Sequence, residues 1–223
     1  ESAKILNPSK TVLMPDITAD CPMAHMADIE TIKRIKAEYE DVAVVCYINS
    51  TAELKSYSDV CVTSSNAVTI VKALPNKHIF FIPDQNLAHY VAQQVPEKHF
   101  IFNDGYCPIH KDITCKDVIA AKARHPQAQF LVHPECPPDV LNYADMIGST
   151  SEIIDYASKS TQKEFLIGTE AGVLYELKQK NPDKTFYTVT DHQCCIDMKK
   201  VTLEKVCHVL RTYEGSVQVS DTL

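Results

Sequence analysis

The chain has 223 residues and a formal net charge of −7; 45% of its residues are hydrophobic and 23% are charged. These proportions are typical of a globular protein and exclude a disordered chain. The acidic balance argues against a nucleic-acid partner, because phosphate binding requires clustered Lys and Arg. Apolar runs span only a few residues, far short of the roughly 20 that cross a bilayer, so we expect no membrane partner.

Short apolar runs alternate with amphipathic stretches along the chain. The apolar runs predict strands at Val42–Ile48, His78–Ile82, Phe100–Phe102, Gln129–His133 and Glu164–Gly168. The amphipathic stretches predict helices at Ile29–Tyr39, Asn86–Gln94, Thr114–Arg124, Glu152–Ser158, Glu170–Lys180 and Thr202–Thr212. Strands followed by helices in this order predict an α/β fold with parallel sheets built from βαβ units.

Polar side chains follow several of the predicted strands. They include Tyr47, Asn49, Asp84, Asp104, His133, Glu135, Ser149, Thr150, Thr169 and Glu170. Because ligands of parallel α/β folds bind beyond the carboxyl ends of the strands, this recurrence predicts a shared site. The chain has only five glycines, and they form neither a dinucleotide-binding nor a P-loop motif. A Rossmann site and a P-loop are therefore excluded.

Nine cysteines are many for this length, and an odd number cannot pair completely. No export signal is visible, so a reducing cytosol is favoured over a disulfide framework. Three cysteines, Cys21, Cys107 and Cys195, lie in separate turn-like segments. On spacing alone, their meeting at one metal site is a weak hypothesis. The first residues, ESAKILNP, have neither an initiator Met nor a signal peptide, and we interpret them as the middle of a domain.

Eight sequence blocks point to one family. They are ESAKILNPSKTVLMPD, CPMAHMAD, VVCYINSTAELKSYSDVCVTSSNA, IPDQNLAHYVA, GYCPIH, HPECPPDVLNYADMIGSTSEI, IGTEAGVLYELKQKNP and CIDMKKVTLEKV. On these blocks the chain resembles the quinolinate synthases along essentially its whole length. The resemblance implies three α/β/α lobes, related by pseudo-threefold symmetry, around a central cluster site. We expect residues 23–107 and 108–195 to form two lobes, and 1–22 with 196–223 to be the remainder of a first lobe whose N-terminal part is missing.

The resemblance also implies an iron–sulfur cofactor. A [4Fe-4S] cluster would be ligated by Cys21, Cys107 and Cys195, and Cys195 is preferred over the adjacent Cys194. The other cysteines, Cys46, Cys61, Cys115, Cys136 and Cys207, fall outside the ligand motifs and are expected to be structural. The family usually has Gly where this chain has Asp20, which puts the shape of the cluster pocket in question.

The family's substrate-facing residues carry over at matching motifs. Catalytic roles are implied for Tyr47, His133 and Glu135. Substrate contacts are implied for Tyr47, Ile48, Asn49, Ser64, His110, His133, Pro134, Glu135, Ser149 and Thr150. Ser149 and Thr150 have a simpler alternative role at the start of a helix, with Thr150 as the cap.

The implied reaction condenses iminoaspartate with dihydroxyacetone phosphate to quinolinate, in de novo NAD biosynthesis. The enzyme would be cytoplasmic and functionally linked to an L-aspartate oxidase. Two other hypotheses remain open. One is a non-catalytic iron–sulfur or metal-binding module derived from the enzyme. The other is a structural zinc protein that uses His192, Cys194 and Cys195; bound iron and labile sulfide would exclude it.

Overall fold

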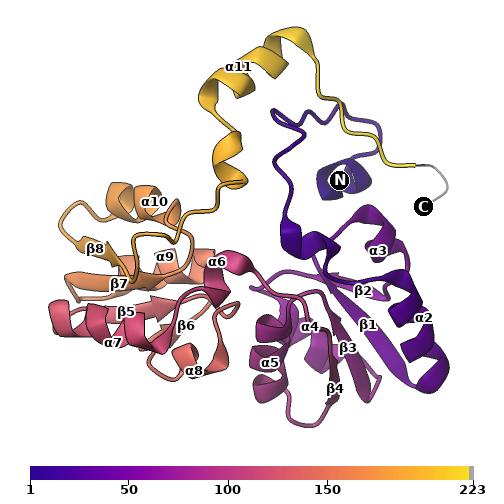
Figure 1. Ribbon diagram of the computed structural model, residues 1–223, viewed down its shortest axis with the longest axis horizontal. Coiled ribbons are helices and arrows are strands. Elements are labelled where there is room, and N and C mark those ends of the chain that lie inside the picture. The colour runs from indigo at the N-terminus through magenta and orange to yellow at the C-terminus, as the bar shows by residue number, and fades with distance from the viewer. Residues whose placement is uncertain (221–223) are drawn as a thin grey trace.

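Two parallel four-stranded sheets organise the computed structural model, which describes residues 1–220 (Figure 1). The first sheet contains β1 (Val42–Tyr47), β2 (Val60–Val62), β3 (His78–Ile82) and β4 (His99–Phe102), in the order β2-β1-β3-β4. The second contains β5 (Gln129–Val132), β6 (Met146–Ile147), β7 (Glu164–Gly168) and β8 (Thr185–Thr188), in the order β6-β5-β7-β8. All pairings are parallel, which confirms the predicted α/β class.

Both faces of the first sheet are covered by helices. Side chains alternate between the faces of a strand. In β1, Val45 packs with residues of α4 (Ala67–Ala73) and α5 (Gln85–Gln94). The next residue, Cys46, packs on the other face with residues of α2 (Ile29–Glu38) and α3 (Ala52–Ser56). Burial on both faces explains why β1 and β3 read as continuous apolar runs.

The second sheet is built in the same way. Phe130 of β5 packs with residues of α7 (Cys115–Arg124) and α8 (Pro138–Leu141). Its neighbour Leu131 packs on the opposite face with residues of α9 (Thr150–Lys159) and α10 (Val173–Lys180). A short helix, α6 (Pro108–Lys111), lies between the two sheets in sequence. The five predicted strands are present, whereas β2, β6 and β8 were not predicted, because they are two to four residues long and only partly buried edge strands.

Helix starts follow local capping chemistry. Ser149, not Thr150, caps α9 in a capping box with Glu152, so the predicted Thr150 cap is wrong. The helix predicted from Glu170 begins at Val173 instead. The Glu170 carboxylate accepts a hydrogen bond from the backbone N–H of Gly172 (2.7 Å). Residues 170–172 therefore form a turn that precedes the helix.

The N-terminal segment and the C-terminal segment up to residue 220 lie side by side (Figure 1), and Met23 of the N-terminal segment packs into the core of the first sheet. They comprise α1 (Ser2–Leu6), 3-10 turns at Pro22–His25 and Met198–Lys200, and α11 (Leu203–Thr212). Met14 N–H donates to the carbonyl of Gly215 (2.8 Å). Gly215 has φ +73°, and a Cβ there would lie 2.5 Å from the Met14 carbonyl oxygen, so only glycine fits. The lobe boundaries and their pseudo-threefold relation stay predictions.

Within residues 1–220, no helix has the length and apolar character needed to cross a membrane.

Candidate active site and metal centre

A pocket of about 570 Å³ lies beyond the carboxyl ends of strands from both sheets. Its wall includes Asn49, Cys107, Glu135, Glu170 and Cys195, which follow β1, β4, β5, β7 and β8 in turn. The N-terminal segment closes it with Met14, Ala19, Asp20, Cys21 and Met23. Parallel strands direct their following loops to one edge of a sheet, so residues far apart in sequence meet here.

The three predicted ligand cysteines all line this pocket. Cys21 and Cys107 each precede a proline that opens a short helix, and both take the N-cap position. Proline tolerates a first helical position because it has no N–H to leave unsatisfied. Cys195 lies in the loop between β8 and the turn at Met198–Lys200.

A carboxylate holds the backbone of each of these cysteines. Cys21 N–H donates to Asp20 Oδ1 (2.9 Å), Cys107 N–H to Asp84 Oδ2 (2.9 Å), and Cys195 N–H to Glu170 Oε1 (3.2 Å). Asp84 and Glu170 each lie two residues beyond the third strand of their sheet. At equivalent positions of the two sheets, Asp84 and Glu170 therefore each accept a hydrogen bond from the backbone of a predicted ligand cysteine.

The cluster implied by the resemblance needs several thiolates at one place. Burial raises the pKa of the Cys21 thiol to about 11, so it is protonated at neutral pH unless a cation binds. A coordinating metal deprotonates such a thiol outright. Three thiols from separate segments on one pocket wall are a donor set that fits an iron–sulfur cluster.

A buried polar network adjoins the cysteines. His110 Nδ1 lies 2.8 Å from Glu135 Oε2, and its Nε2 lies 2.9 Å from Thr169 Oγ1. Tyr47 adjoins Glu135, whose charge acts on the phenol. The ring of His133 stacks on that of His110 with centroids 4.8 Å apart, and its Nε2 lies 3.3 Å from Ser64 Oγ. The tertiary structure thus brings together five of the predicted site residues.

Opposite charges set the protonation of this network. Burial disfavours charge on both His110 and Glu135, but their mutual attraction outweighs it, raising the pKa of His110 and lowering that of Glu135. Burial lowers the pKa of His133 to about 4, so this ring is neutral at pH 7. Burial, and then the charge of Glu135, raise the pKa of Tyr47, which keeps its hydroxyl proton. The site therefore holds an ion pair, a neutral imidazole and a phenol.

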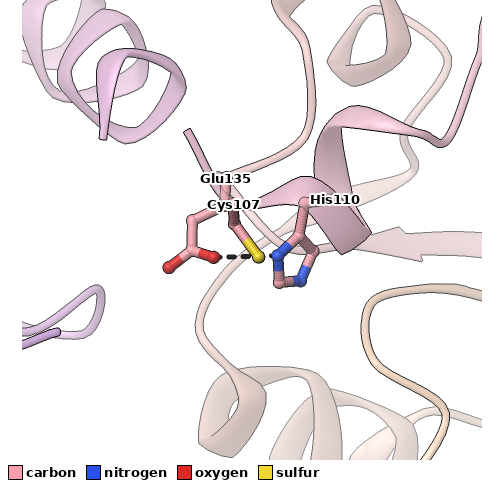
Figure 2. A group of neighbouring side chains, drawn as sticks. All are labelled: Cys107, His110 and Glu135. Carbon is pink, nitrogen blue, oxygen red and sulfur yellow. Dashed lines mark ion pairs between the residues drawn. The ribbon is translucent and has the colours of Figure 1, made fainter. Parts of the chain in front are cut away.

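Cys107, His110 and Glu135 form a compact group of possible ligands (Figure 2). Their ligand atoms all lie within 4.8 Å of one another. His110 Nδ1 is buried and lacks a well-directed hydrogen bond, despite its short distance to Glu135. All three residues line the cysteine pocket, where these three atoms could hold one metal ion. Across residues 1–220, His192, Cys194 and Cys195 do not form such a group, and Cys194 is exposed.

The remaining predicted residues take different places. Asn49 lines the cysteine pocket, and Ile48 lines an adjacent one. Pro134 is buried between His133 and Glu135. Ser149 Oγ donates to Glu152 (2.6 Å) as part of the α9 cap. Neither Ser149 nor Thr150 lies among the residues that line the cysteine pocket within the described chain.

Asp84, Thr169 and Glu170 were predicted as members of the shared strand-end site but without individual roles. All three are strand-end polar residues, but nothing in their local sequence shows which distant atom they contact. Asp84 and Thr169 are buried, and burial, then the charge of Glu135, raise the pKa of Asp84. A polar residue directly after an apolar run was the available signal for these residues.

Comparison with known proteins agrees with the site. A family model described as Quinolinate synthetase A protein matches residues 1–223. The quinolinate synthase of Caldicellulosiruptor saccharolyticus is 53% identical over 210 residues, covering 94% of this chain and 69% of the relative. Those of Alkaliphilus metalliredigens and Clostridioides difficile are each 49% identical, covering 99% and 100% of this chain and 73% of each relative. The chain belongs to the quinolinate synthase family, an enzyme family of NAD biosynthesis.

Proposed function

We propose that this chain catalyses the condensation of iminoaspartate with dihydroxyacetone phosphate to quinolinate, with release of phosphate and water. The observation that carries the proposal is the meeting of Cys21, Cys107 and Cys195 on one pocket wall, together with the buried pair of His110 and Glu135. Cysteines with a purely structural role are not expected to line the same pocket as the buried His110–Glu135 pair.

Cys21, Cys107 and Cys195 would hold a [4Fe-4S] cluster. With three protein ligands, such a cluster has one iron free to act as a Lewis acid toward a substrate hydroxyl. The carboxylates of Asp20, Asp84 and Glu170 orient the three cysteines by holding their backbone N–H groups.

The chain's own side chains would manage protons and orient the substrates. Glu135 lies at the pocket wall, where its carboxylate can accept a proton from a substrate carbon. Tyr47, which adjoins Glu135 and keeps its hydroxyl proton, can return a proton through that hydroxyl. His133 is neutral, so its ring can exchange a proton with substrate or with Ser64.

Substrate anions need donors in the same pocket. The amide of Asn49 at the pocket wall can donate to carboxylate or phosphate oxygens. The hydroxyl of Ser64, which contacts His133 and is not among the residues that line this pocket, would add a second donor. We include Ile48, Pro134, Ser149 and Thr150 as further substrate contacts on the family motifs. We also propose that an L-aspartate oxidase supplies iminoaspartate and that the enzyme is cytoplasmic.

The test begins with anaerobic reconstitution with iron and sulfide. The expected result is about four irons and four sulfides per chain. This content should be lost in Cys21→Ala, Cys107→Ala and Cys195→Ala but retained in the matched control Cys194→Ala, whose thiol is exposed. Cluster loss in Cys194→Ala with retention in Cys195→Ala would overturn the third ligand assignment.

Turnover then separates the enzyme from a non-catalytic module. The reconstituted chain should form quinolinate from dihydroxyacetone phosphate and iminoaspartate generated in the assay. A full cluster without turnover would favour the non-catalytic iron–sulfur module instead.

A further inference from the structure

Two cysteines outside the pocket face each other across neighbouring strands. Cys46 of β1 and Cys61 of β2 are direct partners in the parallel register. Residues in register on parallel strands point to the same face of the sheet. The two thiols accordingly influence each other: the pKa of Cys46 is lowered and that of Cys61 is raised. Neither lines the pocket that holds Cys21, Cys107 and Cys195.

The two thiols differ sharply in exposure. Cys61 lies on the edge strand and is exposed, whereas Cys46 is 0% exposed. Cys46 packs with Ile32, Ile35 and Leu54 of the helices that cover this face. A reagent in solvent therefore reaches Cys61 first, and the thiol next to the modified sulfur is Cys46.

The surroundings of Cys46 stabilise its thiolate. Its Sγ lies 2.8 Å from Ser50 Oγ. Hydrogen bonding from Cys61 is the main cause of a lowered pKa at Cys46, and it outweighs burial with help from Ser50, Ser58 and the charge of Lys55. The thiolate is the nucleophile in thiol–disulfide exchange.

The backbone spacing suits a bond between the two sulfurs. Paired strands lie about 4.8 Å apart. Disulfides join Cα atoms that are roughly 4.4–6.8 Å apart. The two residues can therefore be bridged without moving a strand out of the sheet.

We propose that Cys46 and Cys61 form a reversible thiol–disulfide modification site whose co-reactant is a low-molecular-weight disulfide. The exposed Cys61 sulfur attacks one sulfur of that molecule as its own proton is lost to solvent; the S–S bond of the small molecule breaks, and the departing thiolate takes up a proton. The Cys46 thiolate then attacks the Cys61 sulfur of the mixed disulfide and expels the second thiolate. Two protein thiols are oxidised, and one small disulfide is reduced to two thiols.

The experiment treats the anaerobic, cluster-loaded enzyme with cystamine, followed by alkylation of free thiols and trypsin digestion without reductant. Cleavage after Lys36, Lys55 and Lys72 places Cys46 and Cys61 in separate peptides, 37–55 and 56–72, each with a single cysteine. The expected product is one species with the summed mass of both peptides less two hydrogen atoms. Its appearance should coincide with the loss of both alkylated peptides, and dithiothreitol should restore them.

Variants test the order of the steps. Cys61→Ser, at an exposed position, should abolish the linked species, and Cys46→Ala should leave Cys61 as a stable cystamine adduct. Cys207→Ser removes an exposed thiol of α11 and should leave the linked species unchanged. The proposal is overturned if wild-type Cys61 accumulates only as the adduct, or if the linked species forms only in urea.

Discussion

Asp84 offers a quantitative test of how the site is held together. Its side chain is 0% exposed, and its two oxygens accept from different backbone groups: Oδ1 from Leu87 N–H (2.7 Å) and Oδ2 from Cys107 N–H (2.9 Å). The first bond caps α5, and the second positions the loop of Cys107. Asp84→Ala removes the acceptor oxygen from both of these backbone donors.

The expected cost follows from these two donors. An unsatisfied buried donor costs about 1–3 kcal/mol, so two would cost roughly 2–6 kcal/mol of unfolding free energy. Removing a carboxyl group whose charge is disfavoured by burial and by Glu135 offsets part of this cost. We therefore expect a loss of about 2–3 kcal/mol, in the lower part of that range. Asp84→Asn keeps one acceptor oxygen and should lose about half as much.

Anaerobic urea denaturation of the cluster-free chain measures this loss, and iron content after reconstitution measures the effect on the Cys107 loop. Asp104→Ala is the matched control, because this exposed carboxylate lies in the same loop. Its unfolding free energy should change by less than about 0.5 kcal/mol. If Asp84→Ala changes the unfolding free energy no more than this control does, the reasoning is refuted.

Three further predictions concern catalysis, packing and capping. Glu135→Gln should retain the cluster and slow quinolinate formation by about 10²–10⁴-fold, since the carboxylate is the proposed proton acceptor; a steady-state rate within ten-fold of wild type would contradict that role. Gly168→Ala should lower the unfolding free energy by about 1–3 kcal/mol, because its Cβ would lie 2.7 Å from Phe130 Cε2; an unchanged urea midpoint would mean that the ring moves freely. Asp28 caps α2 by accepting a hydrogen bond from Thr31 N–H, and this bond lowers the pKa of the Asp28 carboxyl. The resulting stabilisation of the folded state is present above the ordinary pKa of about 3.9 and is lost as pH falls through the lowered pKa. Asp28→Ala should therefore cost about 1 kcal/mol at pH 7 and progressively less in acid, as a denaturation series across pH would measure; a pH-independent difference would exclude the cap charge as its source.

The sequence by itself determined the longer elements and the family. Strands β1, β3, β5 and β7 are recognisable because continuous apolar runs reflect burial on both faces, and β4 is recognisable from its apolar residues although it is only partly buried. In the described part of the chain, the six helices of eight or more residues follow because their apolar residues recur with the helical period, whereas the shorter helices α1, α3, α4, α6 and α8 were not predicted. Family motifs marked Cys21, Cys107 and Cys195, because each motif is a short contiguous string.

Only the tertiary structure decided which of these residues meet. His110 and Glu135 are predicted from separate motifs, but their 2.8 Å contact depends on how the loop after β4 packs against the loop after β5. Asp84 and Cys107, and likewise Glu170 and Cys195, are joined across more than twenty residues. The edge strands β2, β6 and β8 were not predicted for a related reason, since they are defined by pairing with a neighbouring strand and not by their own burial. Local patterns encode secondary structure through the chain's own periodicity, whereas the site depends on long-range packing that no single segment contains.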